Sequence, residues 1–315
     1  MPTGLKDVAK AAGVSMATVS RVLAGKSVRS AYRAKVEQAL RSIDYRPNLA
    51  ARRLRAPEAG AIGIIVPDLT NSFFASFVRA VEDLAWSEGL RVMICDSNED
   101  PAREAVHRQL LEEERVSGLL LAPVVSIAAP VASGTPVVLF DRVTGDEPHD
   151  SVMLDNAAAA AALVQALQAD GARSILGLFG EEAGIAADAR ERAFAAYAET
   201  AGVDVRLAHI PFGSDGRREA VRSALSGNPS VDAILAMNND VLLEVAVTLG
   251  NQKSVALACF DEAPWLRLLG PKLRVVSQPV EEMANAALAM LVERMADDQQ
   301  APRHVVFAGL VSEVT

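Results

Sequence analysis

The sequence lacks the features that would place a protein in or across a membrane. No stretch of its 315 residues runs for about 18 apolar positions without a charge, the length that a membrane-spanning helix needs. The first 15 residues also lack the uninterrupted apolar segment of a secretory signal. We therefore expect a cytoplasmic protein that has no membrane partner.

Signatures of metal, nucleotide and covalent chemistry are also absent. The two cysteines, Cys95 and Cys259, stand in strand-like apolar runs rather than at zinc-ligand spacing, so we expect both in the core. The sequence contains neither Gly-x-x-x-x-Gly-Lys nor Gly-x-Gly-x-x-Gly. The histidines have no evident nucleophile partner, and we interpret all of them as structural or surface residues: His107, His149, His209 and His304. These absences predict no metal, no cofactor and no catalytic residue.

Charge is distributed unevenly along the chain. The net charge is −9, which by itself argues against a nucleic-acid partner. Residues 1–57, however, hold twelve Lys or Arg and three Asp or Glu, a net charge of +9, whereas the remainder carries −18. Such asymmetry is typical of a basic nucleic-acid module joined to an acidic body, although a basic face can also be merely solvated.

The basic segment has the anatomy of a helix-turn-helix. Apolar residues recur at helical spacing from Leu5 to Leu40, which predicts three short helices. The first would span Leu5–Ala12, Gly13 would supply the turn, and Ser15 would cap the second helix. In that second helix Arg21 can pair bidentately with guanine O6 and N7. The alternative is a small helical bundle with a solvated arginine.

The residues around this motif resemble a known family. The stretch DVAKAAGVSMATVSRVLAG, followed by YRPNLAARRL, is very similar to the headpiece and hinge of the LacI/GalR family of repressors. In that family the residues that match Met16, Ala17 and Arg21 read bases. Those that match Thr18 and Ser20 contact phosphates or lie beside them. The resemblance therefore implies that the second helix enters the major groove of an operator.

Two positions depart from the family pattern. Ala24 stands where the family usually has Asn, and VRSAYR replaces a cap rich in Ser or Thr before the third helix. Ser30 is the candidate cap in its place. These departures concern local phosphate contacts and leave the module itself unchanged.

The segment PNLAARRL resembles the family's hinge helix, which orders on operator binding. Its inserted leucine corresponds to Leu54, and a minor-groove wedge needs such an apolar side chain beside small residues and near basic ones. Leu54 could instead pack against the core. The predicted DNA-binding residues are Ser15, Met16, Ala17, Thr18, Ser20, Arg21, Asn48, Ala51, Arg52 and Leu54.

Beyond Pro57 the pattern changes to apolar runs of four to six residues, such as IGIIVP and PVVLFD, which alternate with amphipathic stretches. This alternation is typical of parallel strands that crossover helices bury on both faces. It restarts after Asp155, which predicts two similar α/β lobes rather than one continuous sheet. The tail RVVSQPVEEMANAALAMLVERM and the later HVVFAG would carry the chain back between the lobes.

The core also resembles the LacI/GalR family and the periplasmic pentose and hexose binders. The predicted fold is a small all-α helix-turn-helix headpiece plus an α/β core of two doubly wound parallel-sheet lobes, of periplasmic binding protein-like type I. The expected domains are the helix-turn-helix at 1–46, the hinge helix and linker at 47–58, the N-terminal core lobe at 59–155 plus 279–306, and the C-terminal core lobe at 156–278 plus 307–315.

Ligands of open α/β lobes lie beyond the carboxyl ends of strands, so the residues that follow each strand are the effector-site candidates. By this rule the candidates are Asn71, Phe73, Phe74, Asp141, Arg142, Asn239, Asp261 and Gln278. The family resemblance adds Arg190, which matches Arg-x-x-Gly-Phe with Ala193 in place of glycine. It also adds Phe212, at a position that is often Trp or Phe.

The candidate set suits a polyol. Aromatic faces cover C–H surfaces, and Asp, Arg, Asn and Gln make charge-assisted hydrogen bonds to hydroxyls. Singly each residue is weak, because an Asp after a strand often caps a helix, Phe73 could belong to the core, and Asp240 could be either an N-cap or a ligand. The joint pattern resembles ribose binders, so ribose or a related monosaccharide is the favoured effector.

These observations predict a ligand-responsive, sequence-specific transcription regulator, a repressor controlled by a small sugar. It would act as a homodimer on a pseudo-palindromic operator. The alternatives are a sugar-processing enzyme, since α/β folds host many chemistries, and a sugar-binding protein that does not bind DNA. The residues leave open the effector, the sign of its effect, the operator sequence, and a dimer against a tetramer.

Overall fold

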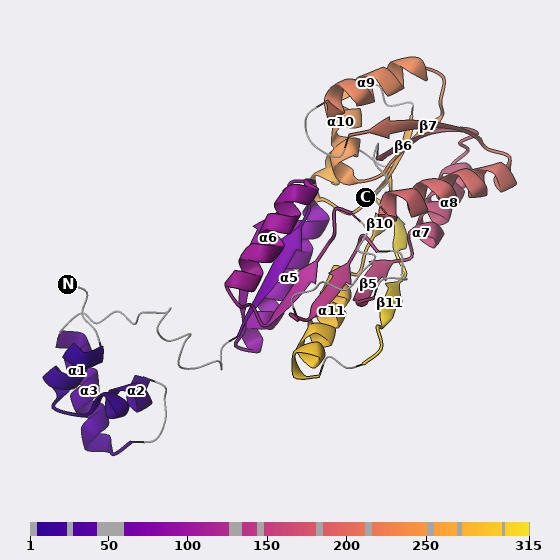
Figure 1. Cartoon of the computed structure of the whole chain (residues 1–315). Helices are drawn as coiled ribbons and strands as arrows, with labels where there is room; N and C mark the ends of the chain where they lie inside the picture. Colours follow the sequence, from indigo (N-terminus) through magenta and orange to yellow (C-terminus); the bar gives the residue numbers. More distant parts are fainter. Residues whose placement is uncertain are drawn as a thin grey trace. The chain divides into compact units, whose positions relative to one another are not determined.

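The structure of the chain is a computed structural model (Figure 1). It describes residues 5–23, 28–42, 60–125, 134–143, 148–180, 185–211, 216–250, 255–269, 273–297 and 300–314. The chain divides into two compact units, Met1–Glu58 and Ala59–Thr315, and each is described by itself. Across the described ranges, no helix is both long enough and apolar enough to span a membrane.

In its described residues, the first unit contains three helices: α1 (Leu5–Ala12), α2 (Met16–Leu23) and α3 (Ser30–Ser42). Their apolar stripes meet in a small core in which Val8, Val19 and Val36 are fully buried. Gly13 has φ +62° at the turn between α1 and α2, a conformation that glycine adopts at little cost.

The caps of these helices are formed differently from one another. Ser15 caps α2 as predicted, because its Oγ accepts a hydrogen bond from the Thr18 amide at 3.2 Å. The expectation for Ser30 is wrong. Ser30 is the first residue of α3, and the carbonyl of Arg29 accepts the first helical bonds, from Tyr32 and Arg33.

The first lobe of the second unit is built on a six-stranded parallel sheet in the order β11-β5-β4-β3-β1-β2. Its strands are β1 (Ala61–Val66), β2 (Arg91–Asp96), β3 (Gly118–Leu121), β4 (Val137–Phe140), β5 (Asp150–Leu154) and β11 (His304–Phe307). Its helices are α5 (Ser72–Ser87), α6 (Pro101–Glu113) and α11 (Val280–Ala296).

Helices cover both faces of this sheet because side chains alternate along each strand. Ile62 and Ile64 pack in one cluster with α5 and α11, whereas Ile65 packs in another with Leu111 of α6. Every strand residue of β3 and β4 is buried, as expected of a parallel sheet covered on both sides.

The second lobe repeats the design around a sheet in the order β12-β10-β9-β8-β6-β7, in which β12 pairs antiparallel with β10. Its strands are β6 (Ser174–Gly180), β7 (Asp204–Ile210), β8 (Ala233–Ala236), β9 (Ala256–Phe260), β10 (Leu273–Ser277) and β12 (Leu310–Glu313). Its helices are α7 (Asn156–Ala169), α8 (Ile185–Ala201), α9 (Arg217–Gly227), α10 (Asn239–Leu249) and the 3₁₀ helix η1 (Pro264–Leu269). The predicted fold of two doubly wound lobes is thus confirmed.

Within the described ranges the chain crosses between the lobes three times, after β5, after β10 and after β11. The third crossing includes Gly309. A Cβ at this position would lie 2.7 Å from Val276 and 3.2 Å from Leu154, so only glycine fits without movement. Those two neighbours lie at the ends of β10 and β5, and the three crossings therefore pack against one another.

The cysteine expectation holds for one residue only. Cys259 is fully buried in β9, whereas Cys95 is only partly buried in β2, which is an edge strand of its sheet. Burial raises the pKa of both thiols. His107 contacts the Asp96 carbonyl at 3.0 Å, which fits a structural role for that histidine.

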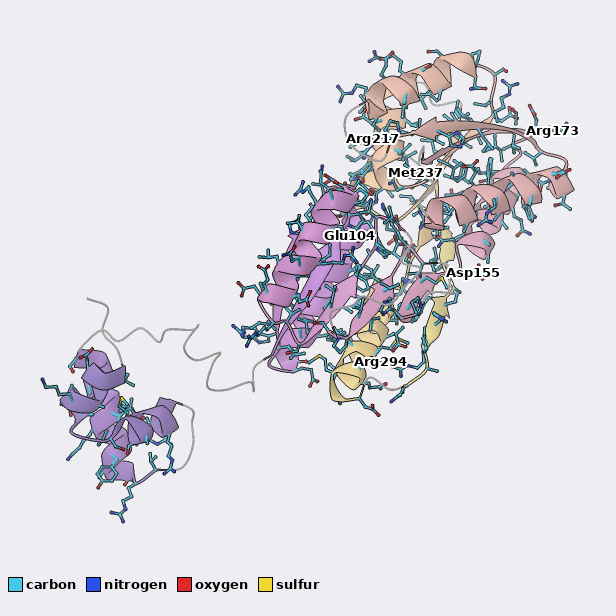
Figure 2. The ribbon with its side chains drawn as sticks, viewed as in Figure 1. Glu104, Asp155, Arg173, Arg217, Met237 and Arg294 are labelled. Carbon is cyan, nitrogen blue, oxygen red and sulfur yellow. The ribbon has the colours of Figure 1, made fainter. Side chains whose placement is uncertain are left out.

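A buried ion cluster joins the start of β5 to the end of α11, where Figure 2 labels Arg294. Asp150 has a fully buried carboxylate, which accepts from Arg294 Nη2 at 2.7 Å and from Arg303 Nη2 at 2.8 Å. Its Oδ1 also accepts from the Arg303 amide at 2.7 Å. The cluster therefore ties β5, α11 and the segment that leads into β11 together.

We predict that Asp150→Ala lowers the free energy of unfolding by about 3 to 5 kcal/mol, because it leaves Arg294 buried without its carboxylate. The measurement is urea denaturation at neutral pH. As a control, Asp83→Ala removes one partner of an exposed pair with Arg79 and should change stability little. Equal stability of the two variants would contradict the role of the cluster.

The same cluster predicts a pH dependence. Burial alone would raise the pKa of Asp150 from 3.8, but hydrogen bonds from Arg294 and Arg303 outweigh it and hold the pKa at about 2. A lowered pKa contributes stability that is present above about pH 4 and is lost as the pH falls toward 2. Denaturation midpoints between pH 5 and 2 should fall more steeply for the wild type than for Asp150→Asn.

Candidate functional site

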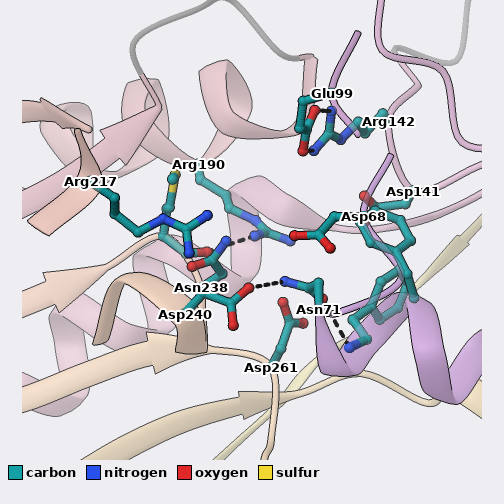
Figure 3. Close-up of a pocket in the computed structure, with 13 residues that line it drawn as sticks. Asp68, Asn71, Glu99, Asp141, Arg142, Arg190, Arg217, Asn238, Asp240 and Asp261 are labelled. Atoms are coloured by element: carbon teal, nitrogen blue, oxygen red, sulfur yellow. Dashed lines mark hydrogen bonds and ion pairs between the residues drawn. The ribbon is translucent and has the colours of Figure 1, made fainter. Parts of the chain in front are cut away.

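The two lobes enclose a cleft beyond the carboxyl ends of their strands (Figure 3). The cavity has a volume of about 50 Å³, space for a few water molecules. A larger ligand therefore requires the lobes or the side chains to move apart. The lining residues are Asp68, Asn71, Phe73, Phe74, Glu99, Asp141, Arg142, Arg190, Arg217, Met237, Asn238, Asp240 and Asp261.

Each lobe contributes an aspartate by the same local device. Asp141 follows Phe140 at the end of β4, and Asp261 follows Phe260 at the end of β9. Both aspartates adopt a left-handed backbone, with φ 61° and 71°. Their amides donate to the carbonyls of Val152 and Val276 on the neighbouring strands, at 2.9 and 3.0 Å. The turn that ends each strand therefore fixes a carboxylate in the cleft.

Both carboxylates are almost fully buried, and burial raises their pKa. The pKa of Asp261 rises from 3.8 to about 6. Arg190 opposes the effect at both residues. Gln278 also opposes it at Asp261, because its Nε2 donates to Oδ1 at 2.6 Å. Asp261 therefore gains a proton when the pH falls to about 6.

Arg190 of α8 is fixed by three contacts. Its Nε donates to Asn156 Oδ1 at 2.7 Å, and its Nη1 donates to the Met237 carbonyl at 2.9 Å. Its guanidinium carbon lies 4.0 Å from the centre of the Phe260 ring, a cation–π distance. A buried and oriented guanidinium of this kind can donate directional hydrogen bonds to a ligand.

Arg142 follows Asp141 and forms a bidentate pair with Glu99. The distances from its Nη1 and Nη2 to the Glu99 carboxylate oxygens are both 2.6 Å. Burial alone would lower the pKa of Arg142, but Glu99 raises it. Figure 3 shows this pair beside the carboxylates of Asp68 and Asp141.

Among the described residues, three hydrogen bonds connect the lobes at the edge of the cleft. Asn71 caps α5, where its Oδ1 accepts from the Phe73 amide, and its Nδ2 donates across the cleft to Asp240 Oδ2 at 3.0 Å. Ser72 Oγ donates to the Glu262 carbonyl at 3.1 Å and accepts from Asn239 Nδ2 at 2.5 Å. These bonds join the start of α5 to the first turn of α10 and to the turn after β9.

The structure brings most of the predicted effector residues together. Seven of them line the cleft, namely Asn71, Phe73, Phe74, Asp141, Arg142, Arg190 and Asp261. Asn239 and Gln278 do not line it but donate to Asp261, which does: Asn239 to its carbonyl at 3.3 Å and Gln278 to its carboxylate at 2.6 Å. Phe212 lies outside the described residues. The role of this set as an effector site stays a prediction.

The structure also tests the alternative interpretations of Phe73 and Asp240. Phe73 and Phe74 are buried in the core of the first lobe and line the cleft as well, with their rings 5.2 Å apart edge to face. The N-cap reading of Asp240 is wrong. Asn238 caps α10 by accepting from the Val241 amide at 2.9 Å, and Asp240 faces Asn71 instead.

Sequence reasoning missed several lining residues. Asp68 and Glu99 follow β1 and β2, so the rule of inspecting strand ends could have found both. Met237 and Asn238 follow β8 in the same way. Arg217 begins α9 and does not directly follow a strand, so the strand-end rule would not have selected it.

The predicted DNA-binding residues fall in two groups. Met16, Ala17 and Arg21 are exposed on α2, whereas Thr18 is half-buried and Ser15 is an exposed cap. The side chain of Ser20 is outside the described part of the chain, as are Asn48, Ala51, Arg52 and Leu54. The proposed contacts with DNA stay predictions.

Two family models match this chain. The one described as "Bacterial regulatory proteins, lacI family" matches residues 4–48, and "Periplasmic binding proteins and sugar binding domain of LacI family" matches residues 59–257. The chain is 30% identical to the HTH-type transcriptional regulator KdgR of Bacillus subtilis (strain 168), over 96% of this chain and 94% of that protein. It is 29% identical to the Ribose operon repressor of Halalkalibacterium halodurans, over 93% of this chain and 90% of that protein.

Solved structures extend the likeness of fold to the full length of the chain. The crystal structure of the lac repressor dimer bound to operator and the anti-inducer ONPF matches with a TM-score of 0.82 and 21% identity, over 100% of this chain and 99% of that one. With a family model over most of its length and near-complete alignment to a regulator at 30% identity, this chain belongs to the LacI family of bacterial regulatory proteins.

Proposed function

We propose that the chain is a sequence-specific transcription repressor and that a small sugar controls its binding to the operator. The observation that carries the proposal is the cleft, in which buried aspartates of both lobes, oriented guanidiniums and two phenylalanine rings converge. This is the mixture of directional polar groups and apolar faces that a polyol requires. The basic helix-turn-helix unit supplies the other half of the function.

The favoured effector is ribose or a related monosaccharide. The cavity is small in this closed arrangement, so a compact ligand needs less opening than a disaccharide. One relative that aligns over most of the chain is named a ribose operon repressor, which supports the same class. The proposal therefore names a monosaccharide as the effector class and ribose as its favoured member.

On the DNA side, two copies of the chain would place their α2 helices in successive major grooves of a pseudo-palindromic operator. Met16, Ala17 and Arg21 are exposed on α2 and so are available to base edges. The hinge at 47–58, with Leu54 as a minor-groove wedge, completes the proposed interface. Basic side chains in the first 57 residues would supply the phosphate contacts.

Ligand and operator would communicate through the relative orientation of the lobes. The cross-cleft bonds of Asn71 and Ser72 belong to one arrangement, and a sugar that enters the cleft must stabilise that arrangement or another. A ligand shifts such an equilibrium only by its difference in affinity for the two states. Linkage then requires operator and sugar to alter each other's affinity by the same factor.

The rival function is a sugar-processing enzyme. The raised pKa of Asp261 is the feature that favours it, since a carboxyl group with a pKa of about 6 can act as a general acid. Against it, the relatives reported above are named as regulators. Incubation of the protein with candidate sugars, followed by chromatography, tests this directly, and turnover would favour the enzyme.

We predict that Arg21→Ala weakens operator binding by about 1 to 3 kcal/mol and relaxes specificity at one base pair, because a bidentate contact is lost. Mobility shifts on operators with single substitutions measure both effects. Lys35→Ala is the control, since it removes the same charge from an exposed position on α3. If both variants lose affinity uniformly across sequences, Arg21 does not read a base.

We predict that Asp261→Asn weakens sugar binding ten-fold or more, because a charged acceptor contributes about 1.5 to 3 kcal/mol. Asparagine tolerates the left-handed backbone that Asp261 adopts, so the variant should fold. Calorimetry with a sugar identified by thermal shift is the measurement, and Asp83→Asn, at an exposed position on α5, is the control. Operator affinity without sugar should be unchanged. Equal sugar affinity in the wild type and Asp261→Asn would make the cleft carboxylate structural only.

Sugar binding should also depend on pH through Asp261. Its surroundings include the charged groups of Arg190, Asp141 and Asp240 together with Gln278, and burial raises its pKa to about 6. Protonation removes an acceptor, so affinity should fall as the pH drops from about 7 through 6. Asp261→Asn should show a flatter profile, and an identical slope in both proteins would assign the dependence to another group.

A further inference from the structure

We propose that Glu99 sets the charge selectivity of the cleft: by occupying the guanidinium fork of Arg142, it makes the site select an uncharged polyol over a sugar acid or sugar phosphate. The inference rests on the proposed function, because it takes the cleft to be the sugar site. It concerns which chemical class of sugar the site accepts.

The first argument is the geometry of the pair. Both terminal nitrogens of Arg142 lie 2.6 Å from the Glu99 oxygens, and the two side chains are only 10% and 18% exposed. A fork that binds one carboxylate in this way is the group that would otherwise bind the carboxylate or phosphate of a ligand. An acidic ligand must therefore compete with Glu99 for Arg142.

The second argument is that the loop after β2 is built to hold Glu99 in place. Asn98 and Glu99 both have positive φ, 51° and 57°, which is uncommon for two adjacent residues other than glycine. Hydrogen bonds compensate for this backbone. The Glu99 amide donates to the Pro67 carbonyl at 2.9 Å, and Asp96 accepts from the amides of Asn98 and Leu69 at 2.7 and 3.1 Å.

The third argument is the charge around the pair. The lining contains five carboxylates and three guanidiniums, a formal charge of −2. Arg190 already donates to Asn156 and Met237, and it faces the carboxylates of Asp141 and Asp261. An anion that enters this cleft meets repulsion of several carboxylates at low dielectric. An uncharged polyol instead gains acceptors for its hydroxyls.

The experiment compares matched pairs of sugars on the full-length protein by calorimetry. Ribose is paired with ribose 5-phosphate, and glucose with gluconate. For the wild type we expect the uncharged member of at least one pair to bind at least about ten times more tightly than its charged counterpart. A charged member that binds as tightly as its partner overturns the inference, and so does the absence of binding by all four compounds.

Glu99→Gln then tests the residue itself. Glutamine keeps one acceptor for Arg142 but removes the competing charge. The ratio of the affinity for the charged sugar to the affinity for its uncharged partner should therefore rise about ten-fold or more. Asp68→Asn is the matched control. It removes another cleft carboxylate, one that acts on Arg142 more weakly than Glu99 does, and asparagine retains the acceptor for the Thr70 amide. We expect a smaller change in the ratio.

An unchanged ratio in Glu99→Gln overturns the assignment, as does an equal change in Asp68→Asn, which would attribute selectivity to overall charge. The wild-type comparison keeps the inference testable even if a variant fails to fold. Operator binding is measured separately. If the wild type binds only gluconate or only ribose 5-phosphate, this inference alone is contradicted. If the wild type fails to bind DNA, the proposed function is contradicted.

Discussion

The guanidinium of Arg190 acts on the buried carboxylates of both lobes, and the cleft depends on it. Asp141 and Asp261 are both buried, and without a shared cation their charges would raise each other's pKa further. Arg190 can play this part because Asn156, the Met237 carbonyl and the Phe260 ring leave it little freedom. One oriented cation thus allows two acidic acceptors to face the same small cavity.

Those acceptors come from equivalent places in the two sheets. A phenylalanine ends the strand, an aspartate in the left-handed region follows, and its amide bonds to the adjacent strand. The site is therefore assembled from two halves that are each rigid within their own lobe. A change in the angle between the lobes alters the distance between the halves without disturbing either one.

How far the sequence predicts this arrangement follows from what apolar runs encode. They locate the ends of buried strands, and that is enough to select Asn71, Asp141 and Asp261. They do not encode which way a side chain points, so the strand-end rule also selects Asn239 and Gln278, which do not line the cleft and instead donate to Asp261. The strand-end rule extends to Glu99 after β2, but its pairing with Arg142 depends on a loop with two left-handed residues, which apolar runs do not encode. The sequence predicts Cys95 in the core because a run of apolar residues looks the same in an edge strand as in a central one.

Gly309 has a mechanical consequence. A single connection between two bodies acts as a tether and permits sliding, twisting and separation, whereas three parallel connections act as a flexure that permits mainly bending. In this chain the connections touch, because Gly309 lies against residues at the ends of β5 and β10. Sliding of one lobe past the other would shear that contact. The motion left to the core is a rocking about the crossings, and its lever arm is longest at the far ends of the lobes.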